Sequence, residues 1–140
     1  MVSLQTLTKE DLPFLLEVRN DKSTRKYLEN NSIFTLEQCK LWFERLSHPW
    51  FIVVNEQGEK VGYFRTNHFN EVGCDIHPNH RRKGYARQAY QEYLKDKTEA
   101  KLWVFYNNFA RKLYEDLGFT YDGLHKRIRG EDYIHMIWKK

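Results

Sequence analysis

The sequence predicts an α+β fold in which helices flank a mixed, mainly antiparallel sheet, giving three layers (α/β/α). The first observation is periodicity, because apolar residues alternate or recur at helical spacing in the order βααβββαβαββ. The second is a run of three extended segments, separated only by tight turns, which is typical of antiparallel neighbours. The third is size, since 140 residues suffice for one sizeable core but not two. We therefore expect a single domain over residues 1–140.

The first third of the chain is expected to contain one strand and two helices, with a short helical piece continuing from the first helix. Thr8 with Asp11, and Thr35 with Gln38, have the spacing of capping boxes, in which each side chain bonds the backbone amide of the other residue. Apolar residues at helical spacing follow both pairs, so the pairs mark helix starts. The expected ranges are a strand at 3–6 and helices at 9–19, 23–28 and 35–46.

The rest of the chain is expected to form strands with two more helices. Gly118 should end the second of these helices, because glycine readily adopts the left-handed conformation found there. The polar segment 123–130 is predicted to be a loop. The expected strands are 50–55, 60–66, 71–76, 101–106, 119–122 and 133–138, and the expected helices are 85–95 and 109–117.

Composition argues against a membrane protein. The sequence has no apolar run of about eighteen residues and no signal-peptide segment. Cys39 and Cys74 make no disulfide framework and are interpreted as small buried hydrophobic residues in a reducing compartment. We therefore expect a soluble, cytoplasmic protein without a membrane partner.

The most informative segment is a basic, glycine-bearing turn between the strand at 71–76 and the helix at 85–95. A helix N-terminus has unpaired amides and a positive dipole end, and Gly84 lets a ligand approach the backbone closely. These features predict a pyrophosphate site. The P-loop and Rossmann glycine motifs are absent, so neither class of nucleotide-binding protein is expected.

This turn also accounts for much of the positive charge. A net charge of +4 favours nucleic-acid binding at first sight. The basic residues outside the turn are interleaved with acids, however, so we expect no nucleic-acid partner. The four basic residues of the predicted anion site are Arg81, Arg82, Lys83 and Arg87.

Two short motifs resemble those of a known family. Arg81, Gly84 and Ala86 form R-x-x-G-x-A, which resembles the pattern [QR]-x-x-G-x-[GA] of the acetyl-CoA pyrophosphate loop in GNAT (GCN5-related) N-acetyltransferases. After a predicted strand, residues 107–119 resemble the family segment N-x-x-[AS]-x-x-x-Y-x-x-x-G-F. The two motifs occur in the family order, and the resemblance extends over almost the whole chain.

The resemblance implies that acetyl-CoA is the co-substrate. Tyr114 would be the general acid that protonates the coenzyme A sulfur, or else a half-buried helix aromatic. Asn107 would contact the coenzyme or cap a helix, and the amides of 82–87 would bind the pyrophosphate. The implied coenzyme-binding set is Cys74, Ile76, His77, Arg81, Arg82, Lys83, Gly84, Tyr85, Ala86, Arg87, Asn107, Phe109 and Ala110.

Three residues are candidates for the general base. Glu71, Asp75 and His77 alternate onto one face of the strand before the turn. Asp75 or Glu71 could accept the proton of the amine, and His77 is the third choice. The spacing Asp75-x-His77-x-x-His80 could suggest a metal site, but it crosses a proline-containing turn beside three cations, so no metal is expected.

A looser resemblance concerns the acceptor. Segment 17–21, together with Arg25, resembles the branch that includes ribosomal-protein N-terminal and amino-sugar acetyltransferases. In that branch the segment lies over the acceptor site, so Arg19, Asn20 and Arg25 are candidate substrate contacts. We expect a small amine such as an amino sugar. A protein N-terminus, or a non-catalytic module that binds acetyl-CoA, is the alternative. The protein is expected to be a monomer or homodimer.

Overall fold

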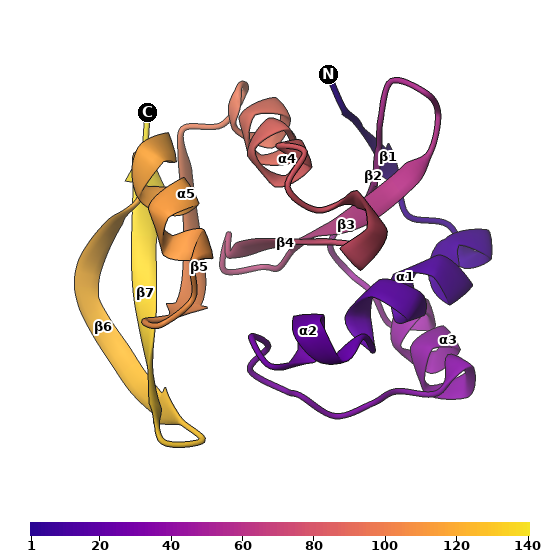
Figure 1. The fold of residues 1–140 in the computed structure, drawn as a ribbon, viewed down its shortest axis with the longest axis horizontal. Helices are drawn as coiled ribbons and strands as arrows, with labels where there is room; N and C mark the ends of the chain where they lie inside the picture. The colour runs from indigo at the N-terminus through magenta and orange to yellow at the C-terminus, as the bar shows by residue number, and fades with distance from the viewer.

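The computed structural model describes residues 1–140 and contains two antiparallel β-sheets (Figure 1). The strand order is β1-β2-β3-β4 in the first sheet and β5-β7-β6 in the second. The strands are β1 (Ser3–Thr6), β2 (Phe51–Val54), β3 (Lys60–Thr66), β4 (Val72–Ile76), β5 (Glu99–Phe105), β6 (Thr120–Ile128) and β7 (Glu131–Lys139).

Helices cover both faces of the first sheet. Figure 1 shows α1, α2 and α3 below this sheet and α4 above it. Contacts agree, since α1 packs on β3 and β4 while α4 packs on β4 and β1. The predicted α+β arrangement in layers is therefore confirmed. None of the helices has the length and apolar character needed to span a bilayer. The helices are α1 (Leu12–Arg19), α2 (Lys22–Arg25), α3 (Leu36–Glu44), α4 (Tyr85–Leu94) and α5 (Ala110–Leu117).

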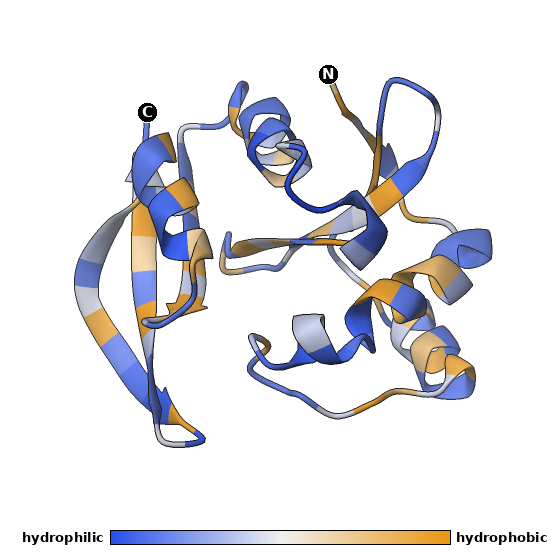
Figure 2. Cartoon of the chain, viewed as in Figure 1, coloured by the Kyte–Doolittle hydropathy of each residue, from blue (hydrophilic) through white to orange (hydrophobic).

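Two apolar clusters fill the space between the layers. One cluster joins α4 and α5 to both sheets and includes Phe64, Tyr90 and Tyr114. The other joins α1 and α3 to the first sheet and includes Leu12 and Tyr63. Figure 2 shows that α1 is largely hydrophobic, whereas the connection from β4 to α4 is hydrophilic. Burial of apolar side chains thus holds the first sheet between its helices. The hydrophilic connection from β4 to α4 remains available for other contacts.

A single β-bridge joins the backbones of the two sheets. Glu71 forms an isolated parallel bridge with Lys101, and the amide of Lys101 donates to Asn70 O. Beyond this bridge β4 and β5 form no ladder with each other. Backbone donors and acceptors on two facing strand edges are therefore free to bind an extended ligand.

Local structure follows the sequence in most places. Both capping boxes are present, so the helix starts at Thr8 and Thr35 are confirmed. The first helix begins with a 3₁₀ turn at Lys9–Asp11, and the helix predicted at 23–28 is shorter than expected. Gly118 ends α5 in the left-handed conformation, as predicted.

The prediction of a loop at 123–130 is wrong, because β6 extends through most of this segment. Arg129 and Gly130 have φ values of 50° and 79° and form the turn between β6 and β7, with the two positive φ angles that favour a tight hairpin. The strand is exposed along almost its whole length. Polar residues therefore fill both faces, and the apolar alternation that would reveal a strand is missing.

Candidate functional site

The basic turn ends in a helix with free amides. Arg82 and Gly84 adopt positive φ angles of 63° and 81°, and Gly84 is the N-cap of α4. The backbone amides of 82–87 donate no hydrogen bond within the chain, and the first helical bond here runs from Gln88 N to Gly84 O. Six consecutive free donors at the positive end of a helix form a suitable site for a pyrophosphate.

Backbone conformation, not packing, favours glycine at position 84. A β-carbon at this position would meet only Gln88 Nε2, at 3.8 Å, so packing does not demand glycine. Its left-handed φ does favour glycine, and the open space above it leaves the backbone accessible.

The Arg81 side chain points away from these amides. Its guanidinium donates to Ile76 O at 3.0 Å, Ser23 Oγ at 2.6 Å and Thr24 Oγ1 at 2.9 Å. The sequence predicted a coenzyme contact here, whereas the structure shows a side chain that ties the turn to α2. No local pattern could reveal this, because the partners lie 57 and 58 positions away.

The other basic residues of the turn lie at the surface. Arg82 and Lys83 are exposed, and Arg87 pairs with Asp116 of α5 at 3.2 Å. Tyr85 accepts a hydrogen bond from Asn55 through its hydroxyl. Arg82 and Lys83 can therefore screen a bound phosphate without losing a protein partner.

The end of β4 presents different groups to its two sides. Cys74 packs against the cluster under α4, and burial raises the pKa of its thiol, so it stays protonated. Asp75 lies on the opposite face, where Tyr63 donates a 2.6 Å hydrogen bond to its carboxylate. His77 turns toward α1, with Nε2 3.1 Å from Glu17. The predicted alternation of Glu71 and Asp75 onto one face agrees with the register of β4 against β3.

Tyr114 lies in the core between α5 and α4. Its ring packs edge-on against Tyr90 and Phe119. Burial raises the pKa of Tyr114 to about 12, so its hydroxyl holds a proton at neutral pH. Cys74 of β4 packs against the same apolar cluster as Tyr114.

Asn107, the first residue of the second motif, does not cap a helix. It is exposed and makes no hydrogen bond, while Asn108 Oδ1 accepts a hydrogen bond from the amide of Ala110 at the start of α5. Phe109 is 91% exposed. The apolar ring of Phe109, within the motif, is thus exposed to solvent and available to cover a ligand.

A cleft of about 760 Å³ opens on the side opposite α4. Its walls come from α3, the segment after α2, β3, the start of β4, β5 and β7. Glu71 and Arg65 line it, and several aromatic side chains complete the walls: Trp42, Trp50, Tyr63, Trp103 and Tyr133.

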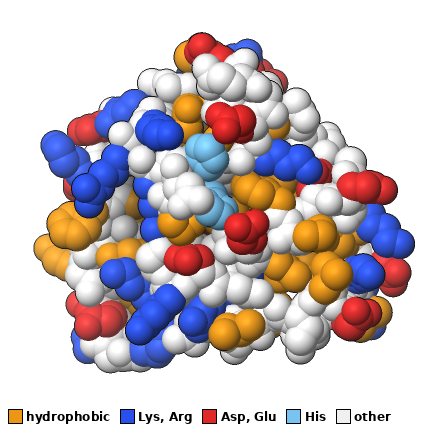
Figure 3. Space-filling model, turned by 45° about the vertical axis from the view of Figure 1, so that its right-hand side comes forward, with side chains coloured by type: hydrophobic (Ala, Val, Ile, Leu, Met, Phe, Trp, Pro, Cys, Tyr) orange, Lys and Arg blue, Asp and Glu red, His pale blue; other side chains and the backbone are white.

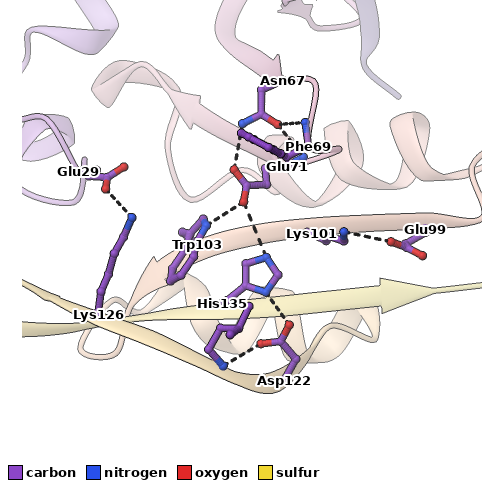
Figure 4. Close-up of polar contacts among 11 residues, drawn as sticks. Glu29, Asn67, Phe69, Glu71, Glu99, Lys101, Trp103, Asp122, Lys126 and His135 are labelled. Carbon is purple, nitrogen blue, oxygen red and sulfur yellow. Dashed lines mark hydrogen bonds and ion pairs between the residues drawn. The ribbon is translucent and has the colours of Figure 1, made fainter.

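Glu71 is the most highly connected acid of this cleft (Figure 4). Its carboxylate accepts hydrogen bonds from Asn67 Nδ2 at 3.0 Å and from Trp103 Nε1 at 2.9 Å. His135 Nε2 lies 3.8 Å away, and its Nδ1 is 2.7 Å from Asp122. Glu71 and His135 thus point toward each other across the junction between the sheets. His135 and Asp122 were not identified from the sequence, since β6 was predicted to end at 122.

The three residues that were predicted to contact the acceptor all form hydrogen bonds with the loop between α2 and α3. Arg19 donates to Asn30 O and Ser32 O at 2.7 and 2.8 Å, and Arg25 donates to Asn31 O at 3.2 Å. The Asn20 amide forms a pair of hydrogen bonds with the backbone of Phe34. Arg19 lines the cleft, but the donors of all three side chains are used to shape its rim.

No group of three or more His, Cys, Asp or Glu side chains is arranged to hold a metal ion. His77 and His80 are neighbours, with ring centroids 6.1 Å apart. Asp75 is directed to Tyr63 instead.

Known proteins resemble this chain in sequence and in fold. Residues 5–119 match the model of the family described as "Acetyltransferase (GNAT) family". No curated protein matches the chain.

Solved structures share the fold. The chain is similar to a spermidine N-acetyltransferase from Vibrio cholerae in complex with CoA and spermine, with 22% identity, a TM-score of 0.87, and 99% and 95% of the two chains covered. An N-acetyltransferase from Staphylococcus aureus Mu50 has 21% identity, a TM-score of 0.75, and 99% and 98% coverage. A GNAT-family acetyltransferase from Bacillus anthracis has 18% identity, a TM-score of 0.81, and 99% and 94% coverage.

Proposed function

The chain belongs to the acetyltransferase (GNAT) family and is an acetyl-CoA-dependent N-acetyltransferase, and from this premise we propose that its acceptor is the primary amine of a small molecule. The observation that carries the proposal is the cleft of about 760 Å³ with Glu71 in its wall. This volume falls within the range of about 300–1,000 Å³ that is typical of small-molecule sites. The similar Vibrio cholerae structure holds CoA with the small amine spermine, which supports this class.

The amino sugar favoured by the sequence is one member of this class. Its basis is still the resemblance of segment 17–21 to one branch of the family, and the comparisons do not single out that branch. We keep the broader acceptor class as the proposal. We also propose that residues 1–140 form one domain, since both apolar clusters use residues of β2 and β3.

On the coenzyme side, we propose that the amides of 82–87 bind the pyrophosphate and that Arg82 and Lys83 add positive charge. Acetyl-CoA supplies the acetyl group as a thioester. The unpaired edges of β4 and β5, near Cys74 and Ile76, offer backbone groups to its extended arm. Phe109 and Ala110 would then cover the ligand, and Asn107 has a free side chain to contact it.

Two residues are proposed to move protons. Tyr114 donates to the departing sulfur, because its buried hydroxyl keeps its proton at neutral pH. Glu71 accepts a proton from the amine, because it lines the cleft. Asp75 is the second candidate base, but its carboxylate already accepts a hydrogen bond from Tyr63.

A nucleic-acid partner is not part of the proposal. Basic and acidic side chains are interspersed over the face drawn in Figure 3. A protein that binds a nucleic-acid backbone typically presents a continuous stripe of basic side chains.

The test is a titration with acetyl-CoA followed by an acceptor screen. Purified protein is titrated calorimetrically with acetyl-CoA, and release of the CoA thiol is then measured with amino sugars, polyamines, amino acids and an N-terminal peptide. We expect acetyl-CoA to bind and at least one small amine to be acetylated. Acetylation of the peptide alone would overturn the proposed acceptor class.

A further inference from the structure

Arg65 is a partly buried cation of the cleft that has no partner in the chain. It lies on β3 and lines the cleft, yet it forms no hydrogen bond and no ion pair. Arg19, in the same cleft, donates to two backbone carbonyls. A guanidinium has five donors in a rigid fork and is costly to bury without acceptors. Arg65 therefore has donors available for a ligand.

The position of Arg65 depends on Gly73. The two residues are cross-strand neighbours, and the guanidinium lies across the glycine. A β-carbon at Gly73 would come within 2.3–2.4 Å of Nε, Cζ and Nη2. The φ of Gly73 is not in the left-handed region, so the reason for glycine here is space. The missing side chain lets the guanidinium lie flat against β4.

Carboxylates lie on both sides of this cation. Glu71 and Asp75 are two positions before and after Gly73 on the same face, roughly 7 Å along the strand in each direction. Burial lowers the pKa of Arg65, but Asp75 and the neighbouring tyrosines Tyr63 and Tyr133 together outweigh burial and hold the pKa above its usual range. Arg65 thus stays charged, and neither carboxylate bonds to it.

We propose that Arg65 binds a carboxylate of the acceptor, which makes the acceptor an α-amino acid rather than a simple amine. This inference rests on the proposed function, because it assumes that a small amine enters this cleft. An α-amino acid has its carboxylate and ammonium about 3 Å apart, so the nitrogen of an acid held by Arg65 stays close to β4 and Glu71. Trp103 and Tyr133 form aromatic walls beside this position and suit an apolar or aromatic side chain.

The reaction balances with groups already described. The nitrogen of the amino acid forms a bond to the acetyl carbon, and the bond from that carbon to the coenzyme sulfur breaks. The ammonium first releases one proton to solvent, so that the neutral amine attacks. The nitrogen then loses its second proton to Glu71, and the departing sulfur receives one from Tyr114. Glu71 releases its proton to water and Tyr114 regains one from water, which leaves one net proton in solution. Arg65 exchanges no proton, because its guanidinium stays charged at all relevant pH values.

The test uses acceptor pairs that differ only in the carboxylate. Acetylation of tryptophan is compared with tryptamine, and phenylalanine with phenethylamine, by CoA-thiol release. A charge-assisted hydrogen-bond pair predicts a kcat/KM for the acid about 10- to 100-fold above that for the amine. Arg65→Met should reduce this ratio to near one. Arg45 lines the same cleft and is also unpaired, but it is exposed to solvent at the rim. Arg45→Met is therefore the matched control and should change the ratio less than about threefold.

A second variant keeps the charge and moves it. Gly73→Ala should displace the guanidinium and lower the same ratio, while the calorimetric affinity for acetyl-CoA controls for folding. An equal preference for acid and amine in the wild type would overturn the inference and leave the proposed function standing. An equal loss with both acceptors in Arg65→Met would show a structural role. Failure to acetylate any small amine would overturn both proposals.

Discussion

The indole Nε1 of Trp103 donates a 2.9 Å hydrogen bond to Glu71 Oε2, next to the single bridge that joins the two sheets. The bridge brings β4 and β5 together at one end, and the hydrogen bond orients a carboxylate at that place. Beyond it the two strands form no ladder. One side chain pair therefore connects the junction of the sheets to the wall of the acceptor cleft.

This geometry predicts unequal roles for the two candidate bases. Glu71→Gln should lower kcat by about 10²-fold or more, because the amide cannot accept a proton from the amine. Asp75→Asn should have a smaller effect, since the carboxylate is directed to Tyr63. Steady-state kinetics with one acceptor over a range of pH measures both variants. The reverse order of effects would identify Asp75 as the base.

Gly84 offers a direct test of the pyrophosphate site. Gly84→Glu should weaken acetyl-CoA binding by about 10²-fold, because a carboxylate would stand among the free amides. Gly84→Ala is the matched control, which retains the strain of the positive φ, about 1–2 kcal/mol, without adding charge. Calorimetric titration gives the affinities, and thermal unfolding gives the stabilities. Unchanged affinity in Gly84→Glu would remove the assignment.

Tyr114→Phe tests the general acid. We expect kcat to fall by about 10²-fold with little change in affinity for acetyl-CoA. The pKa of Tyr114 is raised to about 12, so its protonated form persists as the pH rises through the usual tyrosine range. The wild-type rate should therefore show no loss from this group below about pH 11. Full activity in the variant would assign the proton to another donor.

The rim loop can be tested through Asn20. Asn20→Ala removes both hydrogen bonds to the backbone of Phe34 and should loosen the segment after α2. We expect KM for the acceptor to rise about tenfold, while acetyl-CoA affinity stays unchanged, because the coenzyme site lies on the other side of the sheet. A change in coenzyme affinity alone would contradict this placement.

Stability at acid pH should depend on Asp11. Burial raises the pKa of this carboxyl, but Lys60 at 2.7 Å and the hydrogen bonds from Thr8 outweigh burial and leave the pKa below 3.8. A depressed native pKa stabilises the fold above the unfolded value, and this contribution disappears as the pH falls through the native value. Asp11→Asn should therefore lower the free energy of unfolding at neutral pH more than below about pH 3. Urea unfolding at both pH values measures this difference, and equal losses would contradict it.

Much of this protein was predictable from local patterns. The capping boxes at Thr8 and Thr35 identify helix starts, because both partners lie within one turn. Gly84 and Gly118 identify backbone positions with positive φ, since few other residues adopt them. The fold class and the conformation of the basic glycine turn follow from such short-range features.

Contacts between distant segments could not be predicted in the same way. Arg81 and Arg19 have the same local appearance as free anion-binding residues, yet their donors are used by Ser23 and by Asn30. The strand predicted at 119–122 is only the start of β6, and the rest of β6 was missed because its exposed faces carry no apolar pattern.

The sequence by itself determined the helix caps, the order of the elements and the basic glycine turn, because each depends on residues within a few positions of one another. Only the tertiary structure decided which charged side chains stay free. Arg65 is unpaired and Arg81 is not, because hydrogen bonding depends on which distant atoms the packed sheets and helices bring within about 3 Å. That selection placed Glu71 and Arg65 in one cleft, which is the proposed acceptor site.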